Sequence, residues 1–255
     1  MAVAPQVWVI PGMLVSYGEM VDTQQHNHPL LQLTMFCGTG SLLLSDNQTS
    51  DDREVRCSLL NSNVPHILNM QKGWVVLIEP QSEIGRQLLK LLSNADVLPF
   101  DGTREALTQL DIDFPYQQII SFLNQLDDQV HWEHYLGEVS VNDNRINQLI
   151  SKLNLCFTNE CLKPENWRAE QVAKELALSE SRFLHLFKQQ MGIAWRPYLL
   201  WRRLICAVKL IIAGETATDA AYRAGFSDSA HLSRTFKAIF GISIRQSKAM
   251  FKLDN

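Results

Sequence analysis

Apolar residues recur three and four positions apart through the C-terminal third of the chain, a spacing typical of amphipathic helices. Within residues 229–240 these apolar positions fall on one arc of a helical wheel, and small or cationic residues fall on the opposite arc. Gly225 indicates a tight turn from an earlier helix at 217–224, with Ser227 or Asp228 as the N-cap of the second helix. The pattern therefore predicts a helix, a turn and a second helix.

A second copy of this pattern lies upstream, because residues 178–193 repeat the spacing of residues 226–242. After the turn, equivalent positions are 49 residues apart, as Phe183 and Leu232 are; before the turn they are 48 apart. The second copy therefore has one extra turn residue. Residues 198–212 contain no Gly or Pro and predict a connecting helix of about 22 Å. Such a spacer could place the two second helices in successive major grooves of DNA, about 34 Å apart.

Residues 166–252 resemble the double helix-turn-helix domain of the AraC/XylS transcription regulators. The likeness rests on DAAYRAGF (219–226), on LSRTFKAIFGI (232–242), and on Arg203 and Ala207 in the connecting helix. The resemblance implies activation of transcription as the more frequent outcome, and base-facing positions on each second helix. By the helical arcs, these positions are Ser181, Arg182 and His185 in the first copy, and Ser229, Ala230, Ser233 and Arg234 in the second.

The charge distribution supports DNA binding independently of any family. Residues 166–252 hold 14 Lys and Arg against 6 Asp and Glu, whereas residues 1–165 hold 9 against 20, within a chain of net charge −4. A basic module of this kind suits neutralisation of phosphates. We predict phosphate contacts for five cationic side chains, with an ordinary solvated charge as the alternative at each. They are Lys188, Arg196, Arg202, Arg203 and Lys237.

Short runs rich in Val, Leu and aromatic residues, separated by polar turns, fill the first 80 residues and predict antiparallel strands that close into a small barrel. The segments VDTQQHNHPLLQL (21–33) and NSNVPHILN (61–69) resemble a cupin. Metal-binding cupins typically use His-x-His, a Glu and a later His. Here Gln32 stands in place of the Glu, which removes the one anionic ligand.

Two interpretations of these histidines remain open. Three imidazoles and an amide could hold zinc, iron, copper or nickel, which would make the N-terminal half a metal-dependent cupin enzyme. Because no carboxylate accompanies them, we predict no metal, no other cofactor and no enzyme activity, and favour a small-molecule effector inside the barrel. The predicted effector-binding residues, each with a purely structural role as the alternative, are His26, His28, Gln32, His66 and Trp74.

Helical spacing returns between residues 84 and 165. Within it, an apolar stripe is formed by Ile146, Ile150 and Leu153. Three interpretations stay open: the stripe packs on the barrel, belongs to an ordinary core, or pairs with a second subunit. The family resemblance favours pairing. The predicted domains are residues 1–157 for effector sensing and dimerisation, a linker at 158–166, and a DNA-binding domain at 167–255.

Other classes of protein fit the sequence less well. No apolar run approaches the 18 or more residues of a membrane span, and the first residues lack the features of a signal peptide. The five cysteines form no CxxC pair, which argues against a disulfide framework and a structural zinc site. We therefore expect a cytoplasmic protein without a membrane partner.

Together these patterns predict an α+β protein, with an N-terminal cupin-like antiparallel β-barrel, following helices, and a C-terminal all-α tandem helix-turn-helix. The predicted function is that of a sequence-specific DNA-binding transcription regulator controlled by a small-molecule effector. Its expected partners are double-stranded DNA and the effector. RNA polymerase and a second copy of the chain stay open as further partners.

Overall fold

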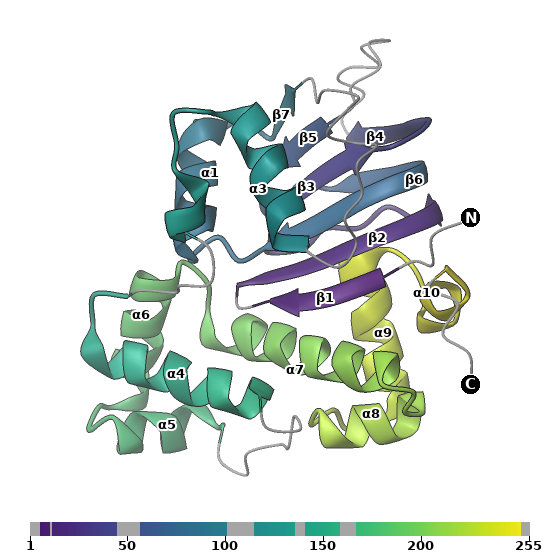
Figure 1. Ribbon diagram of the computed structural model, residues 1–255. Coiled ribbons are helices and arrows are strands. Elements are labelled where there is room, and N and C mark those ends of the chain that lie inside the picture. Colours follow the sequence, from purple (N-terminus) through teal and green to yellow (C-terminus); the bar gives the residue numbers. More distant parts are fainter. Residues whose placement is uncertain are drawn as a thin grey trace. The chain divides into compact units, whose positions relative to one another are not determined.

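The structure, a computed structural model, divides into two compact units (Figure 1). The first unit comprises residues 1–138 with 236–254, and the second comprises residues 139–235. Residues 159–166, nearly all of the predicted linker, lie outside the described residues, so the predicted domain boundaries stay predictions. The described residues are 6–10, 12–44, 57–100, 115–135, 141–158 and 167–250.

The first unit is built on a seven-stranded sheet in which every pairing is antiparallel. The strand order is β1-β2-β6-β3-β5-β7, and β4 pairs with β6 outside this path. The strands are β1 (Gln6–Ile10), β2 (Met13–Asp22), β3 (Leu31–Phe36), β4 (Gly40–Leu44), β5 (Cys57–Leu60), β6 (His66–Ile78) and β7 (Val97–Phe100). The predicted cupin-like antiparallel sheet is confirmed. Among the described residues, however, no pairing joins β1 to β7, so the strands form an open sheet and not a closed barrel.

Strand β6 is the longest strand and organises the sheet. One of its edges pairs with β2, while the other pairs first with β4 and then with β3. The change of partner falls near Gly73, which lies opposite Phe36. A Cβ atom at Gly73 would lie 2.1 Å from the carbonyl oxygen of Met35, so only glycine allows the strands to approach so closely here.

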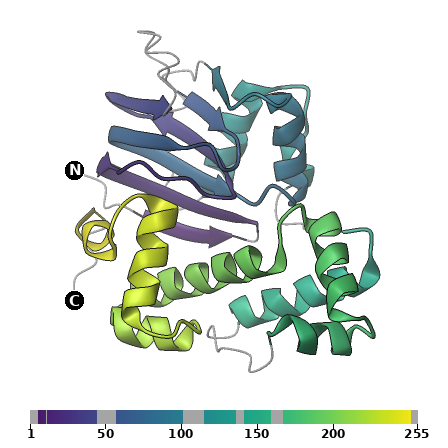
Figure 2. The same ribbon diagram turned by 180° about the vertical axis from the view of Figure 1, so that it is seen from behind.

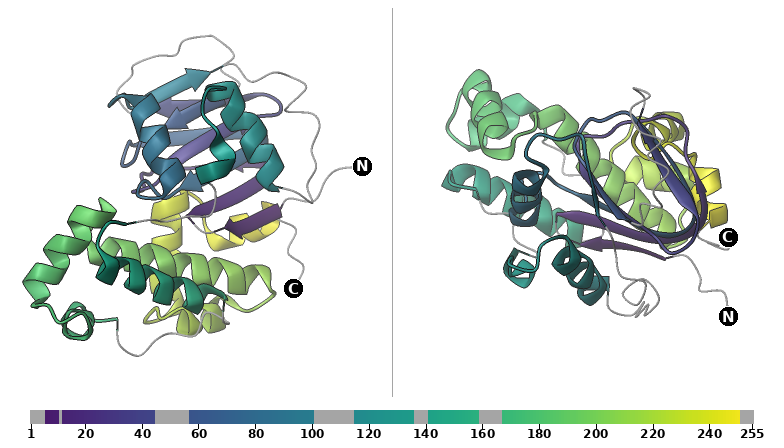
Figure 3. Two further views of the ribbon diagram at one scale, coloured as in Figure 1. Left: turned by 60° about the vertical axis from the view of Figure 1, so that its left-hand side comes forward. Right: turned by 90° about the horizontal axis from the view of Figure 1, so that it is seen from above.

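One face of the sheet carries the apolar core of the first unit. Side chains alternate between the two faces of a strand, and in β3 Leu33 belongs to the face that packs against helices. Leu88 of α1 (Glu83–Leu92) and Phe122 of α3 (Pro115–Leu126) join the same core. Figure 3 shows both helices over this side of the sheet, and a short 3-10 helix, η1 (Trp132–Tyr135), adds Trp132.

The opposite face of β3 is also buried but is partly polar. Gln32 and Thr34 alternate with the core residues along the strand, and Thr34 is aligned with Ser58 on β5. All three side chains are buried. Because buried polar groups need hydrogen-bonding partners, this face is a candidate binding site for a ligand.

The second unit is helical (Figure 2). Its helices are α4 (Asn144–Thr158), α5 (Ala169–Glu175), α6 (Glu180–Met191), α7 (Trp195–Ile212) and α8 (Ala217–Arg223). The next helix, α9 (Ser229–Phe240), begins in this unit and ends in the first, to which α10 (Ile244–Met250) belongs. The predicted connecting helix is confirmed as α7, whose 18 residues correspond to about 27 Å. No helix in the described part of the chain is long and apolar enough to cross a membrane.

Aromatic side chains hold α6 and α7 together. The Trp195 ring lies 5.3 Å from that of Phe183 and 5.0 Å from that of Phe187, both in edge-to-face geometry. The indole nitrogen of Trp195 also donates to the carbonyl oxygen of Trp167, at 3.3 Å. The first predicted helix-turn-helix thus has its own packed core.

The apolar stripe of α4 is part of this same core. Ile146, Ile150 and Leu153 are buried together with Phe183 and Phe187 of α6. The stripe therefore packs against the first helix-turn-helix, as the ordinary-core alternative predicted. Its apolar surface is covered, so the structure gives no support for pairing of this stripe with a second subunit.

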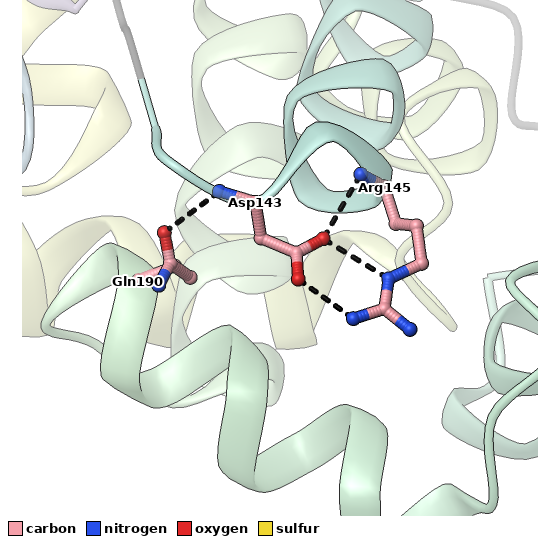
Figure 4. A network of polar contacts seen from close by, with 3 residues as sticks. All are labelled: Asp143, Arg145 and Gln190. Atoms are coloured by element: carbon pink, nitrogen blue, oxygen red, sulfur yellow. Dashed lines mark hydrogen bonds and ion pairs between the residues drawn. The ribbon is translucent and has the colours of Figure 1, made fainter.

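A polar network fixes the start of α4 to α6 (Figure 4). The backbone nitrogen of Asp143 donates to the side-chain oxygen of Gln190, at 3.1 Å. The Asp143 carboxylate accepts two hydrogen bonds from the Arg145 guanidinium, at 3.1 and 2.7 Å, which lower the pKa of this carboxyl to about 2. The carboxylate thus stays charged near the amino end of α4, where the helix dipole favours it.

Candidate DNA-binding helices and a buried histidine cluster

The first helix-turn-helix has a well-defined turn. The backbone nitrogen of Ala177 donates to the carbonyl of Lys174 at 3.1 Å, and that of Leu178 donates to the carbonyl of Ala173 at 2.9 Å. These two bonds are the Schellman pattern that ends many helices. Ala177 has φ = 53°, and Ser179 then caps α6 by accepting a bond from a backbone amide of its first turn, at 3.2 Å.

The second helix-turn-helix repeats this turn. The backbone nitrogen of Gly225 (φ = 84°) donates to the carbonyl of Tyr222 at 3.1 Å, and that of Phe226 donates to the carbonyl of Ala221 at 2.9 Å. Asp228 is the N-cap, because its side chain accepts a bond from a first-turn amide at 2.6 Å. Five residues separate α8 from α9 and four separate α5 from α6, which confirms the extra turn residue.

Helix α6 buries one face and exposes the other. Its apolar residues Phe183, Leu186 and Phe187 are at most 5% exposed. The residues predicted to face DNA lie on the other side of the helix, and all are exposed: Ser181, Arg182, His185 and Lys188. The predicted division of this helix into a packed and a free face is confirmed.

Helix α9 has the same division. Leu232 and Phe236 are buried, whereas Ser229 is half-buried. Four residues predicted to contact DNA are exposed: Ala230, Ser233, Arg234 and Lys237. Within the described residues, neither Arg234 nor Lys237 forms an ion pair, so both cations are available to a phosphate or a base.

Two of the residues predicted to contact phosphate, Arg202 and Arg203 on α7, are not exposed in the structure. Arg202 is only 8% exposed, and its guanidinium donates to the carbonyl of Leu153 at 3.1 Å and to the side-chain oxygen of Asn154 at 2.9 Å. The predicted DNA contact of Arg202 is therefore wrong, because this side chain ties α7 to α4. Arg203 is half-buried, and its burial lowers the pKa of the guanidinium, so it is a weaker candidate than the exposed Arg196.

The predicted histidines converge on the first unit. His26 and His66 form an antiparallel bridge, since each backbone nitrogen donates to the other's carbonyl, at 3.0 and 2.9 Å. Residues directly opposite in such a pair project to one face, and so do residues two apart along an extended chain. His28 therefore joins them, and the ring centroids lie 4.2 Å (26–66), 5.2 Å (28–66) and 5.8 Å (26–28) apart.

Each imidazole is oriented by a backbone carbonyl that lies two residues away. Nδ1 of His26 is 2.9 Å from the carbonyl oxygen of Gln24, Nδ1 of His28 is 3.1 Å from that of Leu30, and Nδ1 of His66 is 2.9 Å from that of Val64. A carbonyl only accepts, so in neutral His26 and His66 the proton is on Nδ1 and Nε2 keeps a lone pair, whereas His28 has an oxygen near both ring nitrogens. Burial lowers the pKa of His28 to about 4 and of His66 to about 3, so both rings are neutral at pH 7.

Gln32 completes the cluster, and Trp74 lies apart from it. The Gln32 side-chain oxygen is 3.2 Å from Nε2 of His28, while its amide nitrogen donates to the Thr34 hydroxyl at 3.1 Å. Trp74 is fully buried in the apolar core, stacked on Trp8 at 5.6 Å between ring centroids. The structure thus brings together four of the five residues predicted to bind an effector.

Sequence reasoning missed the polar neighbours of this cluster. Thr34 fixes the Gln32 amide, and Ser58 lies beside Thr34 with a buried hydroxyl that has no hydrogen-bonding partner among the described residues. The alternation of Gln32 and Thr34 along β3 is the signal that could have identified this polar face.

Comparisons with known proteins agree with the geometry of the helical repeats. Residues 172–250 match a family described as a helix-turn-helix domain. RhaS of Escherichia coli, an HTH-type transcriptional activator, is 33% identical over 158 residues, which cover 60% of this chain and 49% of the relative. RhaS of Citrobacter koseri is 39% identical over 105 residues, covering 41% and 36%. The chain thus spans about half or less of the length of these curated relatives.

Solved structures resemble nearly the whole chain. ToxT from Vibrio cholerae O395 superimposes with a TM-score of 0.54 at 13% identity, over 94% of this chain and 98% of that one. A ToxT structure from the same species with a bound unsaturated fatty acid gives 0.52 at 13% identity, over 98% of each chain. At this identity the likeness concerns the fold, and it shows the same two-domain arrangement of an antiparallel sheet followed by helices.

The fold and the repeated turn define a helix-turn-helix protein with a separate β-sheet unit. Its C-terminal part matches a helix-turn-helix domain and is similar to the RhaS activators, so the resemblance to the AraC/XylS regulators predicted from the sequence is confirmed.

Proposed function

We propose that the protein is a sequence-specific DNA-binding transcription regulator. The observation that carries this proposal is the repeated helix-turn-helix, in which α6 and α9 follow the same turn and expose a polar, cationic face. Among the described residues, Arg182, Lys188, Arg234 and Lys237 form no ion pair, which suits phosphate and base contacts. RhaS relatives are described as transcriptional activators, which supports activation and not repression.

The sheet unit is the proposed sensor of a small-molecule effector. A buried face that carries His28, Gln32, Thr34 and Ser58 among apolar residues has the few convergent polar groups typical of ligand sites. The fatty acid bound to ToxT supports ligand binding by this fold. Because its proposed partner is DNA, we place the protein in the cytoplasm.

The alternative function, a metal-dependent cupin enzyme, has less support. In the described part of the chain, only His26, His28 and His66 form a group of potential metal ligands, and no carboxylate joins them. A hydrolase or oxygenase would also need an acid, a base or a nucleophile beside them. We therefore infer a binding function for this unit.

The α4 stripe bears on oligomeric state. Its apolar residues are covered within the helical unit, so a homodimer would need another surface. RNA polymerase stays a proposed further partner, to be tested on the selected operator.

Selection from a random pool of double-stranded DNA with the full chain tests the DNA-binding proposal. We expect enriched sequences with two preferred blocks about 10 bp apart, one for each helix-turn-helix. The double variant Arg182→Ala and Arg234→Ala should lose this enrichment. Lys90→Ala, which removes an exposed cation from α1, is the matched control and should enrich the same sequences.

Two results would contradict the proposal. One is binding of all sequences alike, with the strong salt dependence of non-specific phosphate contacts. The other is enrichment that survives in the double variant, because the exposed faces of α6 and α9 would then play no part in recognition.

Mass spectrometry of small molecules extracted from the purified full chain tests the sensor proposal. We expect one compound that the wild-type chain retains and that Thr34→Val retains less, because valine has the shape of threonine without its hydroxyl. Ser41→Ala, on the exposed part of β4, should retain the compound as the wild type does. Equal retention by Thr34→Val would exclude this face as the binding site.

A further inference from the structure

The three imidazoles of the sheet unit form a preorganised set of ligands. One ring nitrogen from each of His26, His28 and His66 lies within 4.8 Å of the other two. Nitrogen atoms bound to one tetrahedral zinc ion, at about 2.0–2.1 Å from it, lie about 3.3 Å apart. The ring nitrogens would therefore need to draw together by up to about 1.5 Å.

The hydrogen-bonding partners of the Nδ1 atoms are of the kind found for histidines that bind a metal. A histidine that binds a metal usually donates its other N–H to a carbonyl, a carboxylate or water, which fixes the ring and its tautomer. All three Nδ1 atoms lie 2.9–3.1 Å from backbone carbonyl oxygens. The Nε2 atom of His66 is buried and has no hydrogen-bonding partner among the described residues, which is costly for a polar atom unless a ligand satisfies it.

Gln32 places its side-chain oxygen beside the same rings. This oxygen lies 3.2 Å from Nε2 of His28, which is about the separation of two ligands of one tetrahedral ion. Donation from the Gln32 amide to Thr34 holds the oxygen in this direction.

We propose that His26, His28 and His66 bind a divalent transition-metal ion, with the side-chain oxygen of Gln32 as a fourth ligand. This site departs from the expectation of no metal that the missing carboxylate suggested. Imidazole favours zinc, copper, nickel and iron, and an uncharged set of donors selects against calcium and magnesium.

Titration of the full chain with Co²⁺ tests the proposal, after treatment with a chelator and without DNA. Visible absorption reports nitrogen coordination of Co²⁺, and elemental analysis gives the stoichiometry. We expect one ion per chain for the wild type. His28→Ala and His66→Ala should weaken binding by at least ~10-fold, the loss that removal of even an outer-shell partner produces. The double variant His131→Ala and His134→Ala removes an exposed histidine pair of similar spacing, 5.7 Å between rings, and should bind as the wild type does.

A gain of affinity makes the test independent of folding defects. Gln32→Glu supplies the missing anionic ligand and should bind Co²⁺ at least ~10-fold more tightly than the wild type, because carboxylates are good ligands for such ions. No saturable binding by the wild type, unchanged binding by His66→Ala, or no gain with Gln32→Glu would each overturn the site. Because DNA is absent, any of these failures leaves the proposed regulator function unaffected.

Discussion

Arg202→Ala should destabilise the helical unit without removing a DNA contact. In the wild type the Arg202 guanidinium is buried and joins the middle of α7 to the carbonyl of Leu153 and the side chain of Asn154 on α4. It also lies over the ring of Tyr198, at 5.9 Å from the centroid. Truncation to alanine would break these links and leave polar atoms of α4 without their partner.

The size of the effect follows from these contacts. A hydrogen bond from a charged donor contributes about 1.5–3 kcal/mol. Arg202 makes two such bonds, but Asn154 is half-buried, so water can replace part of the second one. We therefore expect a loss of about 3 kcal/mol in the free energy of unfolding, which is large against the marginal stability of a domain.

Urea denaturation of the full chain, followed by circular dichroism, measures this loss. Arg196→Ala is the matched control, since Arg196 is an exposed cation on the same helix, and its unfolding free energy should stay within about 0.5 kcal/mol of the wild type. DNA affinity of Arg202→Ala, measured where the protein is folded, should be unchanged. A stable variant with weaker DNA binding and a smaller salt dependence would show that Arg202 contacts phosphate and that the structural assignment is wrong.

Four further predictions follow from exposed or unusual positions. Arg234→Ala should cost about 1–3 kcal/mol of binding and relax the preference at one base pair, measured by titration against the selected operator and its single-base variants. Lys237→Ala should weaken binding to all of these sequences alike and reduce the salt slope by about one, in the same titrations at several salt concentrations. Ala177→Gly should stabilise the helical unit by up to about 1 kcal/mol in urea denaturation, because alanine is disfavoured at φ = 53°; a loss would show that the turn tolerates alanine. Ser58→Ala should raise the melting temperature of the sheet unit, because it removes a buried hydroxyl without a partner among the described residues; a decrease would mean that a partner exists.

The helical repeats were predictable because local rules determine them. Apolar spacing located α6 and α9, and the absence of Gly and Pro over residues 198–212 located α7. The change of offset at the turn correctly gave α8–α9 one more turn residue than α5–α6. Most strands could be predicted for the same reason, from short apolar runs between polar turns. Strand β2 is harder to predict, because Gly18 and Glu19 interrupt its apolar run and its formation depends on pairing with the distant strand β6.

Long-range partners were not predictable from spacing. The stripe of Ile146, Ile150 and Leu153 shows that α4 buries a face, but the period of a helix does not tell what covers that face. The same limit explains Arg202, because a backbone carbonyl and an asparagine are partners that leave no charge pattern in the sequence. Trp74 lies in the apolar core, with its ring 5.0 Å from that of Tyr17, and alternation along β6 alone could not separate it from His66, which is eight residues away.

The two helix-turn-helix copies share a turn but differ in the surface that they expose. The free face of α6 carries the long side chains of Arg182 and Lys188, whereas that of α9 begins with the small residues Ala230 and Ser233. Small side chains let a helix backbone come close to the floor of the major groove, while long cations reach outward to phosphates. We therefore expect α9 to read bases through Arg234 and α6 to contribute mainly affinity, so that the block of the operator under α9 is the more stringent of the two.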